Sequence, residues 1–303
     1  MTGIGALTHN QFRQNSMHTL TEKEELLRPI LGVITSRISE RLLGSTSPNE
    51  VHTPFGVALV SKGSVSGREV VAIERYGPQL SIPSHKINYR ANLWALRSLG
   101  VRAIISQNAI GSLNRMLRPG DVVIPDDLLD RTQGRMATFF DDYAAWVRVD
   151  MTNPFCHRVR NELIRATSEL TERYFPRGTF ACAEGPRLET PAEVKALARE
   201  GGDIVGTPVS TETILAKEAG MCFASIAPII NWGAGLSPEV NHAEMNDFYY
   251  TSGLHERVED AIAGAIGALD PGEVCACHSA LDNAYFGEKP EWLSSWRLDE
   301  GAS

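Results

Sequence analysis

Short apolar runs of strand length alternate with helical segments along most of this 303-residue chain. The runs are rich in Val, Ile, Leu and Ala, whereas the segments between them carry apolar residues at helical spacing. We expect strands at residues 29–34, 57–60, 69–73, 101–105, 121–124, 204–205 and 222–227. We expect helices at residues 89–99, within 153–174, and at 191–200, 210–219 and 254–269. This alternation predicts the α/β class.

Two helix boundaries carry local signals. Gly100 follows the helix at 89–99 and is a typical C-terminal residue for it. Thr190, with Glu193 three positions later, predicts a capping box at the start of the helix at 191–200. No internal repeat or long linker interrupts the pattern, so we expect one domain over residues 29–270. Residues 1–28 are then an N-terminal extension and residues 271–303 a C-terminal tail.

Charge and hydropathy narrow the class of partner. No run of about eighteen apolar residues occurs, so no membrane span is expected. The net charge of −8 argues against nucleic acid, whose phosphates attract clustered Lys and Arg. The N-terminus lacks a basic start followed by an apolar stretch, so we expect no secretory signal and a cytoplasmic location. The common nucleotide-binding patterns G-x-x-x-x-G-K-S/T and G-x-G-x-x-G do not occur, and neither does the nucleophile-elbow pattern G-x-S-x-G.

Five scattered cysteines do not suggest a disulfide framework: Cys156, Cys182, Cys222, Cys275 and Cys277. The one tight group is Cys275-Ala-Cys277-His278, for which a metal site, a surface redox pair and plain packing are all open. Neither a second cysteine pair nor a matching histidine spacing is evident. We therefore favour a redox pair or packing, and expect no metal site.

A series of motifs identifies a family. They are residues 84–96 (SHKINYRANLWAL), 107–113 (QNAIGSL), 119–125 (PGDVVIP), 130–132 (DRT), 184–190 (EGPRLET), 203–206 (DIVG), 212–220 and 224–227, with Asn231 behind them. In this order and spacing they resemble the trimeric branch of the purine nucleoside phosphorylase superfamily. The nearest resemblance is to methylthioadenosine and methylthioinosine phosphorylases, over about residues 29–270.

The resemblance implies a single-domain fold with a central twisted mixed β-sheet flanked by helices, assembled as a homotrimer. It implies an enzyme that joins phosphate to C1′ of a purine nucleoside and releases the base without a cofactor or metal. The transition state is similar to an oxocarbenium ion, so such an enzyme stabilises negative charge on the leaving purine.

For the purine, the resemblance implies contacts from Ala109, Leu188, Glu189 and Asn231. A Glu189 carboxylate can accept the N1–H of a 6-oxopurine, although its charge also suits the start of a helix. Asn231, the candidate catalytic residue, stands where relatives acting on 6-aminopurines carry Asp and those acting on 6-oxopurines carry Asn. Its amide can donate to N7 and face O6. A turn at a strand end is the alternative role for Asn231.

For the sugar, the resemblance implies contacts from Tyr89, Asn108, Thr207 and His242. Asn108, before Ala109, is similar to the residue in 6-oxopurine enzymes, where methylthioadenosine enzymes carry Thr; it could instead end a strand. His242 could also be an ordinary loop residue. Thr207 replaces the Met that the family places under the ribose, which leaves the sugar's identity open.

For phosphate, the candidates are Arg37, Arg75, Tyr76 and Pro208, and here the chain departs from its family. A glycine-rich loop with a hydroxyl becomes Thr35-Ser-Arg-Ile38, an Arg-His-Gly-Arg motif becomes residues 75–78 (RYGP), and Pro208 replaces another hydroxyl. Arg37 could replace lost phosphate contacts, bind a charged group of the substrate, or cap a surface turn.

Three functions follow from these observations. The first is phosphorolysis of a 6-oxopurine nucleoside, such as inosine, guanosine or a 5′-modified analogue. The second is hydrolysis, in which water replaces phosphate and Glu74 or Glu212 serves as the base. The third is a nucleoside-binding protein without catalysis. Retention of Glu189 and Asn231 argues for ligand binding in every case.

Overall fold

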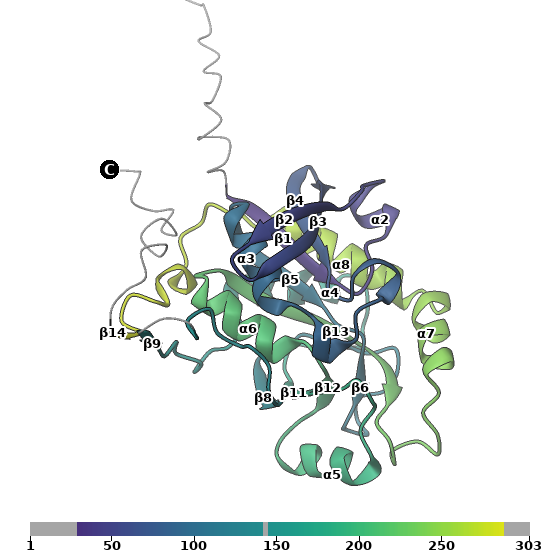
Figure 1. Cartoon of the computed structure of the whole chain (residues 1–303). Coiled ribbons are helices and arrows are strands. Elements are labelled where there is room, and N and C mark those ends of the chain that lie inside the picture. Colours follow the sequence, from purple (N-terminus) through teal and green to yellow (C-terminus); the bar gives the residue numbers. More distant parts are fainter. Residues whose placement is uncertain (1–28, 142–144, 288–303) are drawn as a thin grey trace, which may run out of the picture.

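A computed structural model describes residues 29–141 and 145–287. The N-terminal extension predicted at residues 1–28 and the last part of the predicted tail lie outside the described residues. The described part is built on a twelve-stranded mixed sheet with helices on both faces (Figure 1). The predicted α/β class and the central mixed sheet flanked by helices are confirmed.

Four parallel strands form the middle of the sheet, in the order β4, β1, β5, β13. They are β1 (Ile30–Thr35), β4 (Arg68–Glu74), β5 (Val101–Gln107) and β13 (Cys222–Trp232). Their near-continuous apolar sequences suit strands covered on both faces. Because they run in the same direction, their carboxyl ends meet at one edge of the sheet.

Further strands extend the sheet on both sides, in the overall order β2-β3-β4-β1-β5-β13-β6-β12-β11-β8. Off this path, β7 pairs with β13, and β10 pairs with β7. Their bounds are β2 (Asn49–Thr53), β3 (Gly56–Val65), β6 (Ile110–Ser112), β7 (Val122–Val123), β8 (Asp127–Arg131), β10 (Tyr174–Phe175), β11 (Thr179–Ala183) and β12 (Ile204–Gly206). β6 pairs parallel with β13 and antiparallel with β12, which makes the sheet mixed.

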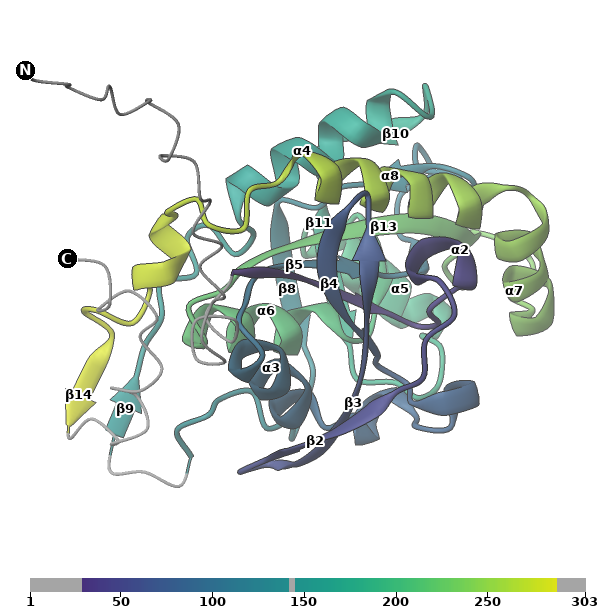
Figure 2. The same cartoon turned by 90° about the horizontal axis from the view of Figure 1, so that it is seen from above.

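Two pairs of helices cover the two faces of the sheet (Figure 2). On one face lie α3 (Tyr89–Ser98) and α6 (Val209–Glu218), and on the other α4 (His157–Ser168) and α8 (Leu254–Ala268). Other helical segments are α2 (Glu40–Leu43), α5 (Pro191–Arg199), α7 (His242–Thr251) and the 3-10 turns η1 (Pro78–Leu80) and η2 (Ser84–Lys86). The apolar side chains between the layers form the core.

Most of the predicted elements are confirmed within a few residues. The Thr190–Glu193 capping box is present: each of the two side chains accepts a hydrogen bond from the other's backbone N–H. The strand predicted to end at residue 227 continues through Pro228 to Trp232, so Asn231 lies inside β13 rather than after it. Pattern reasoning did not predict β2, β6, β8, β11 or α7.

Part of the predicted C-terminal tail packs on the domain. Residues 276–279 form the 3-10 helix η3 (Ala276–Ser279), and β14 (Tyr285–Gly287) pairs with β9 (Ala145–Val147). Leu281 and Ala284 between them are buried. Among the described residues, no helix is long and apolar enough to cross a membrane.

Candidate active site

Polar side chains gather where the central strands end. Thr35, the last residue of β1, donates from its hydroxyl to Oε1 of Gln107 at the end of β5, over 2.7 Å. The Nε2 of Gln107 in turn donates to the hydroxyl of Tyr249 on α7, over 2.9 Å. All three residues are buried. These bonds therefore join the ends of β1 and β5 to α7, three parts of the chain that are far apart in sequence.

Arg75 follows β4 and lies at the centre of a second buried network. Its Nε donates to Glu212 Oε1 over 2.7 Å, and both side chains are 1% exposed. Its terminal nitrogens donate to the carbonyls of Gln107 and Ile34 and to the Ser106 hydroxyl. Every guanidinium nitrogen thus has a protein acceptor, and Arg75 ties three strand ends to helix α6.

Asn108, just after β5, turns its amide into the protein. Its Nδ2 donates to the hydroxyls of Ser106 over 3.0 Å and Ser225 over 2.9 Å. Its Oδ1 is buried and has no hydrogen-bond partner within the described part of the chain. Ala109 next to it is half-buried. The structure therefore leaves an acceptor oxygen unpaired at the edge where the candidate site lies.

Asn231 lies near the carboxyl end of β13, beside a strand irregularity. The register to β6 shifts between Ile229 and Asn231, and Asn231 pairs with Gly111. Such bulges re-aim a side chain and are common beside active sites. A Cβ at Gly111 would lie 3.4 Å from Asn231 Nδ2, which shows that the amide lies directly against Gly111. The amide is half-buried and donates one hydrogen to the Trp232 carbonyl over 2.8 Å.

Leu188 and Glu189 lie in the loop between β11 and α5. Leu188 is exposed, whereas Glu189 is half-buried and lines a cleft of about 380 Å³. Burial raises the pKa of Glu189, and the nearby Glu193 carboxylate adds to this rise. A Cβ at Gly235 would lie 2.9 Å from the Cβ of Pro191, so the segment after Asn231 packs against the start of α5. The segments that carry Glu189 and Asn231 are therefore in contact with each other.

The candidate sugar residues Tyr89 and Thr207 are bridged by an arginine that sequence reasoning missed. Arg135 donates from one terminal nitrogen to the Tyr89 hydroxyl over 3.2 Å and to the Thr207 carbonyl. It also donates to the carbonyl and carboxylate of Glu184. The Thr207 hydroxyl lies 3.5 Å from that of Tyr76. Tyr89, Thr207 and Tyr76 are thus brought together.

Burial raises the pKa of Tyr89 well above its usual range. His242 is the first residue of α7. The helix α7 follows the segment after β13, so His242 belongs to a different segment from the residues that Arg135 contacts.

The loop after β1 does not leave all of its backbone N–H groups free to bind an anion. The backbone N–H of Ile38 donates to Glu74 Oε1 over 2.8 Å, so a carboxylate of the protein already uses this donor. Arg37 is exposed, and its guanidinium carbon lies 5.8 Å from the centre of the Tyr250 ring. Pro208 is buried at the N-cap position of α6 and supplies no side-chain cap.

Comparison with known proteins gives the family. The sequence profile of the phosphorylase superfamily matches residues 35–255. The chain belongs to this superfamily. It is 41% identical over 250 residues to a probable 6-oxopurine nucleoside phosphorylase of Thermococcus kodakarensis, covering 80% of this chain and 93% of that protein. It is also 41% identical to a 6-oxopurine nucleoside phosphorylase of Pyrococcus furiosus, covering 77% of this chain and 90% of that one.

Two further similarities extend this result. A probable S-methyl-5′-thioinosine phosphorylase of Methanothermobacter thermautotrophicus is 39% identical over 80% of this chain and 84% of its own length. The crystal structure of a methylthioadenosine phosphorylase from an antarctic soil metagenomic library superposes with a TM-score of 0.78 at 28% identity. That superposition covers 90% of this chain and 98% of the other. The resemblance to purine nucleoside and methylthioadenosine phosphorylases is confirmed.

Sequence reasoning about this phosphorylase-superfamily chain missed three residues of the network at the sheet edge. Arg135, Gln107 and Glu184 form contacts between segments far apart in the chain. Glu184 begins the recognised motif at residues 184–190, but nothing in that motif indicated its bond to Arg135. Gln107 stood inside a recognised motif, next to Asn108, and its position at the last residue of a strand was the available signal. Arg135 lies in an irregular segment without periodicity, so only the folded structure shows its role.

Proposed function

We propose that this chain catalyses phosphorolysis of a purine nucleoside, with a 6-oxopurine base preferred, releasing free base and sugar 1-phosphate. Inosine, guanosine or a 5′-modified analogue is the substrate class. The observation that carries the proposal is the amide of Asn231, held half-buried at a strand irregularity beside Gly111. The names of the relatives at 41% identity support the same reaction.

Asn231 can assist departure of the base. Its Nδ2 carries two hydrogens, and only one is used by the Trp232 carbonyl. The second can donate to N7 of a purine as the glycosidic bond breaks and negative charge builds on the ring. A donor placed where charge develops stabilises the transition state more than the ground state.

Glu189 complements Asn231 on the other edge of the base. A carboxylate accepts a hydrogen bond from the N1–H that 6-oxopurines carry and 6-aminopurines lack. The raised pKa of Glu189 reflects a partly dry setting, in which such a bond is stronger than in water. Ala109 and Leu188 are the apolar candidates against the base. Tyr89, Asn108, Thr207 and His242 stay the candidates for the sugar.

Phosphate is favoured over water as the nucleophile. Glu212, one candidate base for hydrolysis, is held by Arg75 and by the Ser106 hydroxyl. Glu74, the other, accepts the Ile38 N–H. A carboxylate engaged in this way is a weaker proton acceptor for water. The named relatives are phosphorylases, which agrees with this choice.

The anion pocket is proposed to be altered and weak. Arg37, Arg75, Tyr76 and Pro208 are its candidate residues, but Arg75 is engaged inside the protein and Pro208 has no N–H to give. The Glu74 carboxylate beside the loop also repels an anion. Arg37 is an exposed cation next to this loop, and it can bind phosphate through two parallel hydrogen bonds.

Incubation with inosine, with and without phosphate, tests the reaction. Hypoxanthine and ribose 1-phosphate formed only with phosphate are the expected result. Hypoxanthine released equally without phosphate means a hydrolase, and no release from inosine, guanosine or a 5′-methylthio analogue means a binding protein; either contradicts the proposal. A homotrimer is part of the proposal, and a monomer by light scattering at micromolar concentration would contradict it. The cytoplasmic location stays a prediction.

A further inference from the structure

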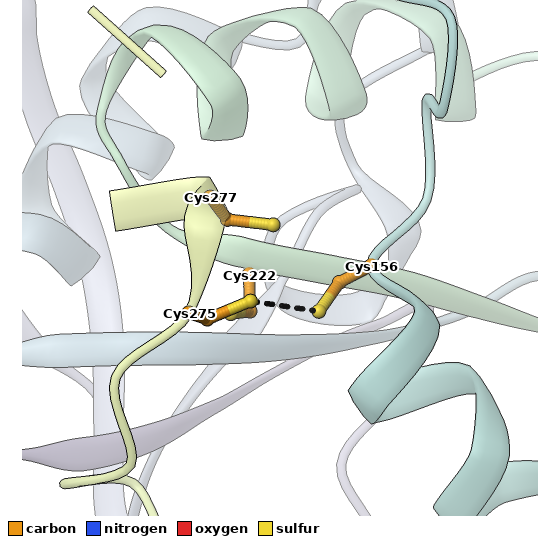
Figure 3. Close-up of side chains that lie close together, drawn as sticks. All are labelled: Cys156, Cys222, Cys275 and Cys277. Atoms are coloured by element: carbon orange, nitrogen blue, oxygen red, sulfur yellow. Dashed lines mark hydrogen bonds between the residues drawn. The ribbon is translucent and has the colours of Figure 1, made fainter. Parts of the chain in front are cut away.

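Four of the five cysteines meet at the edge of the sheet opposite the candidate active site (Figure 3). Cys156 is the N-cap residue of α4, Cys222 begins β13, and Cys275 and Cys277 belong to the turn of η3. Their sulfur atoms all lie within 4.8 Å of one another, and none forms a disulfide. Figure 3 shows the four side chains directed at a common point from three segments of the chain.

We propose that these four cysteines form a tetrahedral site for a zinc ion. A zinc ion bound to four thiolates at about 2.3 Å places its sulfurs about 3.8 Å apart at the edges of a tetrahedron. The Cys156 and Cys275 sulfurs are 3.7 Å apart. The longest separations need to shorten by no more than about 1 Å, which the exposed η3 turn can supply. Soft thiolate ligands in tetrahedral geometry select zinc over hard cations.

The surroundings suit a negatively charged metal centre. Zinc with four thiolates carries a net charge of about −2, which needs nearby donors and cations. The Arg158 Nη2 lies 3.7 Å from the Cys222 sulfur, and the His278 Nε2 lies 3.6 Å from the same atom. Arg102 contacts the other nitrogen of His278 over 2.9 Å. Cys156 at the start of the twelve-residue helix α4 also gains from the helix dipole, which favours a thiolate.

The position of the site indicates a structural role. Four protein ligands leave no coordination position for water or substrate, as in structural zinc sites. Cys222 begins β13 and Asn231 lies nine residues further along the same strand, so about 30 Å of extended chain separates them. The ion would join the segment after α8 to the sheet and to α4. We therefore expect metal loss to lower thermal stability and to leave the chemistry of the base site in place.

The metal content of the full chain, purified under reducing conditions from zinc-supplemented cells, tests the proposal. We expect one zinc per chain by plasma mass spectrometry. Reconstitution with Co²⁺ is expected to give the visible and charge-transfer absorption of a tetrahedral tetrathiolate. Cys277→Ser and Cys275→Ser should each lose the metal or bind it much more weakly. Cys182→Ser is the matched control, because Cys182 is buried on β11 outside the cluster, and it should retain the ion.

Thiol counting gives an independent test that does not need a folded variant. Wild-type protein unfolded with a chelator and without reductant should show all five thiols free. One free thiol, with a mass four hydrogens lower, means two disulfides in the cluster and overturns the proposal. Five free thiols without bound metal after reconstitution also overturn it. So does a metal content that Cys277→Ser and Cys275→Ser leave unchanged.

Discussion

Replacing Arg75 by Met tests whether the buried network at the strand ends holds the fold together. Met has a similar length and no charge, so the change removes the guanidinium with little loss of volume. Glu212 would keep the Ser106 hydroxyl as a partner but would lose its 2.7 Å bond to the Arg75 Nε. A carboxylate that is 1% exposed would then be buried without a counter-charge.

The expected cost follows from the burial of the pair. Breaking a buried ion pair by removing one partner costs about 3–5 kcal/mol, because the remaining charge is uncompensated. The loss of the donor bonds to Ser106 and to two backbone carbonyls acts in the same direction. For a domain of this size about 1 kcal/mol corresponds to about 2 °C, so the melting temperature should fall by about 6–10 °C.

Urea denaturation and thermal melting at one fixed protein concentration provide the assay, because assembly would make both depend on concentration. Arg187→Met is the matched control: its bond to Glu193 is 2.6 Å long, but the arginine is 65% exposed. The control should lose less than about 1 kcal/mol. Adding Glu212→Gln to Arg75→Met should recover part of the loss, because the unpaired charge is then removed. If Arg75→Met costs no more than the control, the reasoning about the buried pair is wrong.

Three further predictions concern the base, the anion and pH. Asn231→Asp should raise the ratio of adenosine to inosine activity, since a protonated Asp accepts from a 6-amino group; equal losses on both substrates, or the same change in Asn161→Asp at an exposed position of α4, would contradict it. Phosphate should saturate the enzyme only at high concentration, and Arg37→Ala should raise its KM about 10-fold or more with the nucleoside KM little changed; low-phosphate saturation that survives Arg37→Ala would show an intact pocket. Burial raises the pKa of Glu218 to about 7, so the folded state holds its proton longer than the unfolded state and stability falls as pH rises through about 4.5–7. The free energy of unfolding, measured by urea titration, should therefore fall by about 2–3 kcal/mol more in wild type than in Glu218→Gln between pH 5 and pH 8. The same pH dependence in both proteins would refute this.

Local sequence signals determined the elements that form the centre of the fold. Strands such as β1 and β5 are continuous apolar runs, and the Thr190–Glu193 capping box fixes the start of α5 within a few residues of sequence. The missed elements lack such signals. β11 consists largely of small residues, β8 is a half-exposed edge strand with a charge at each end, and α7 has no clear apolar face. Asn241, which caps α7 with its side chain, was the signal available there.

Only the tertiary structure decided how the chemically active side chains are used. The sequence marks Arg75 as an anion candidate and Glu212 as a candidate base, yet they are 137 positions apart and meet because β4 and β5 end where α6 begins. Ligand counting along the chain found one cysteine pair, whereas folding adds Cys156 and Cys222 from two other segments. Motif spacing reports interactions within a few residues, and contacts between strand ends depend on the register of the whole sheet. The sequence therefore determined which groups this phosphorylase-superfamily chain carries, and the packing of the sheet decided which of them pair internally and which stay open to a ligand.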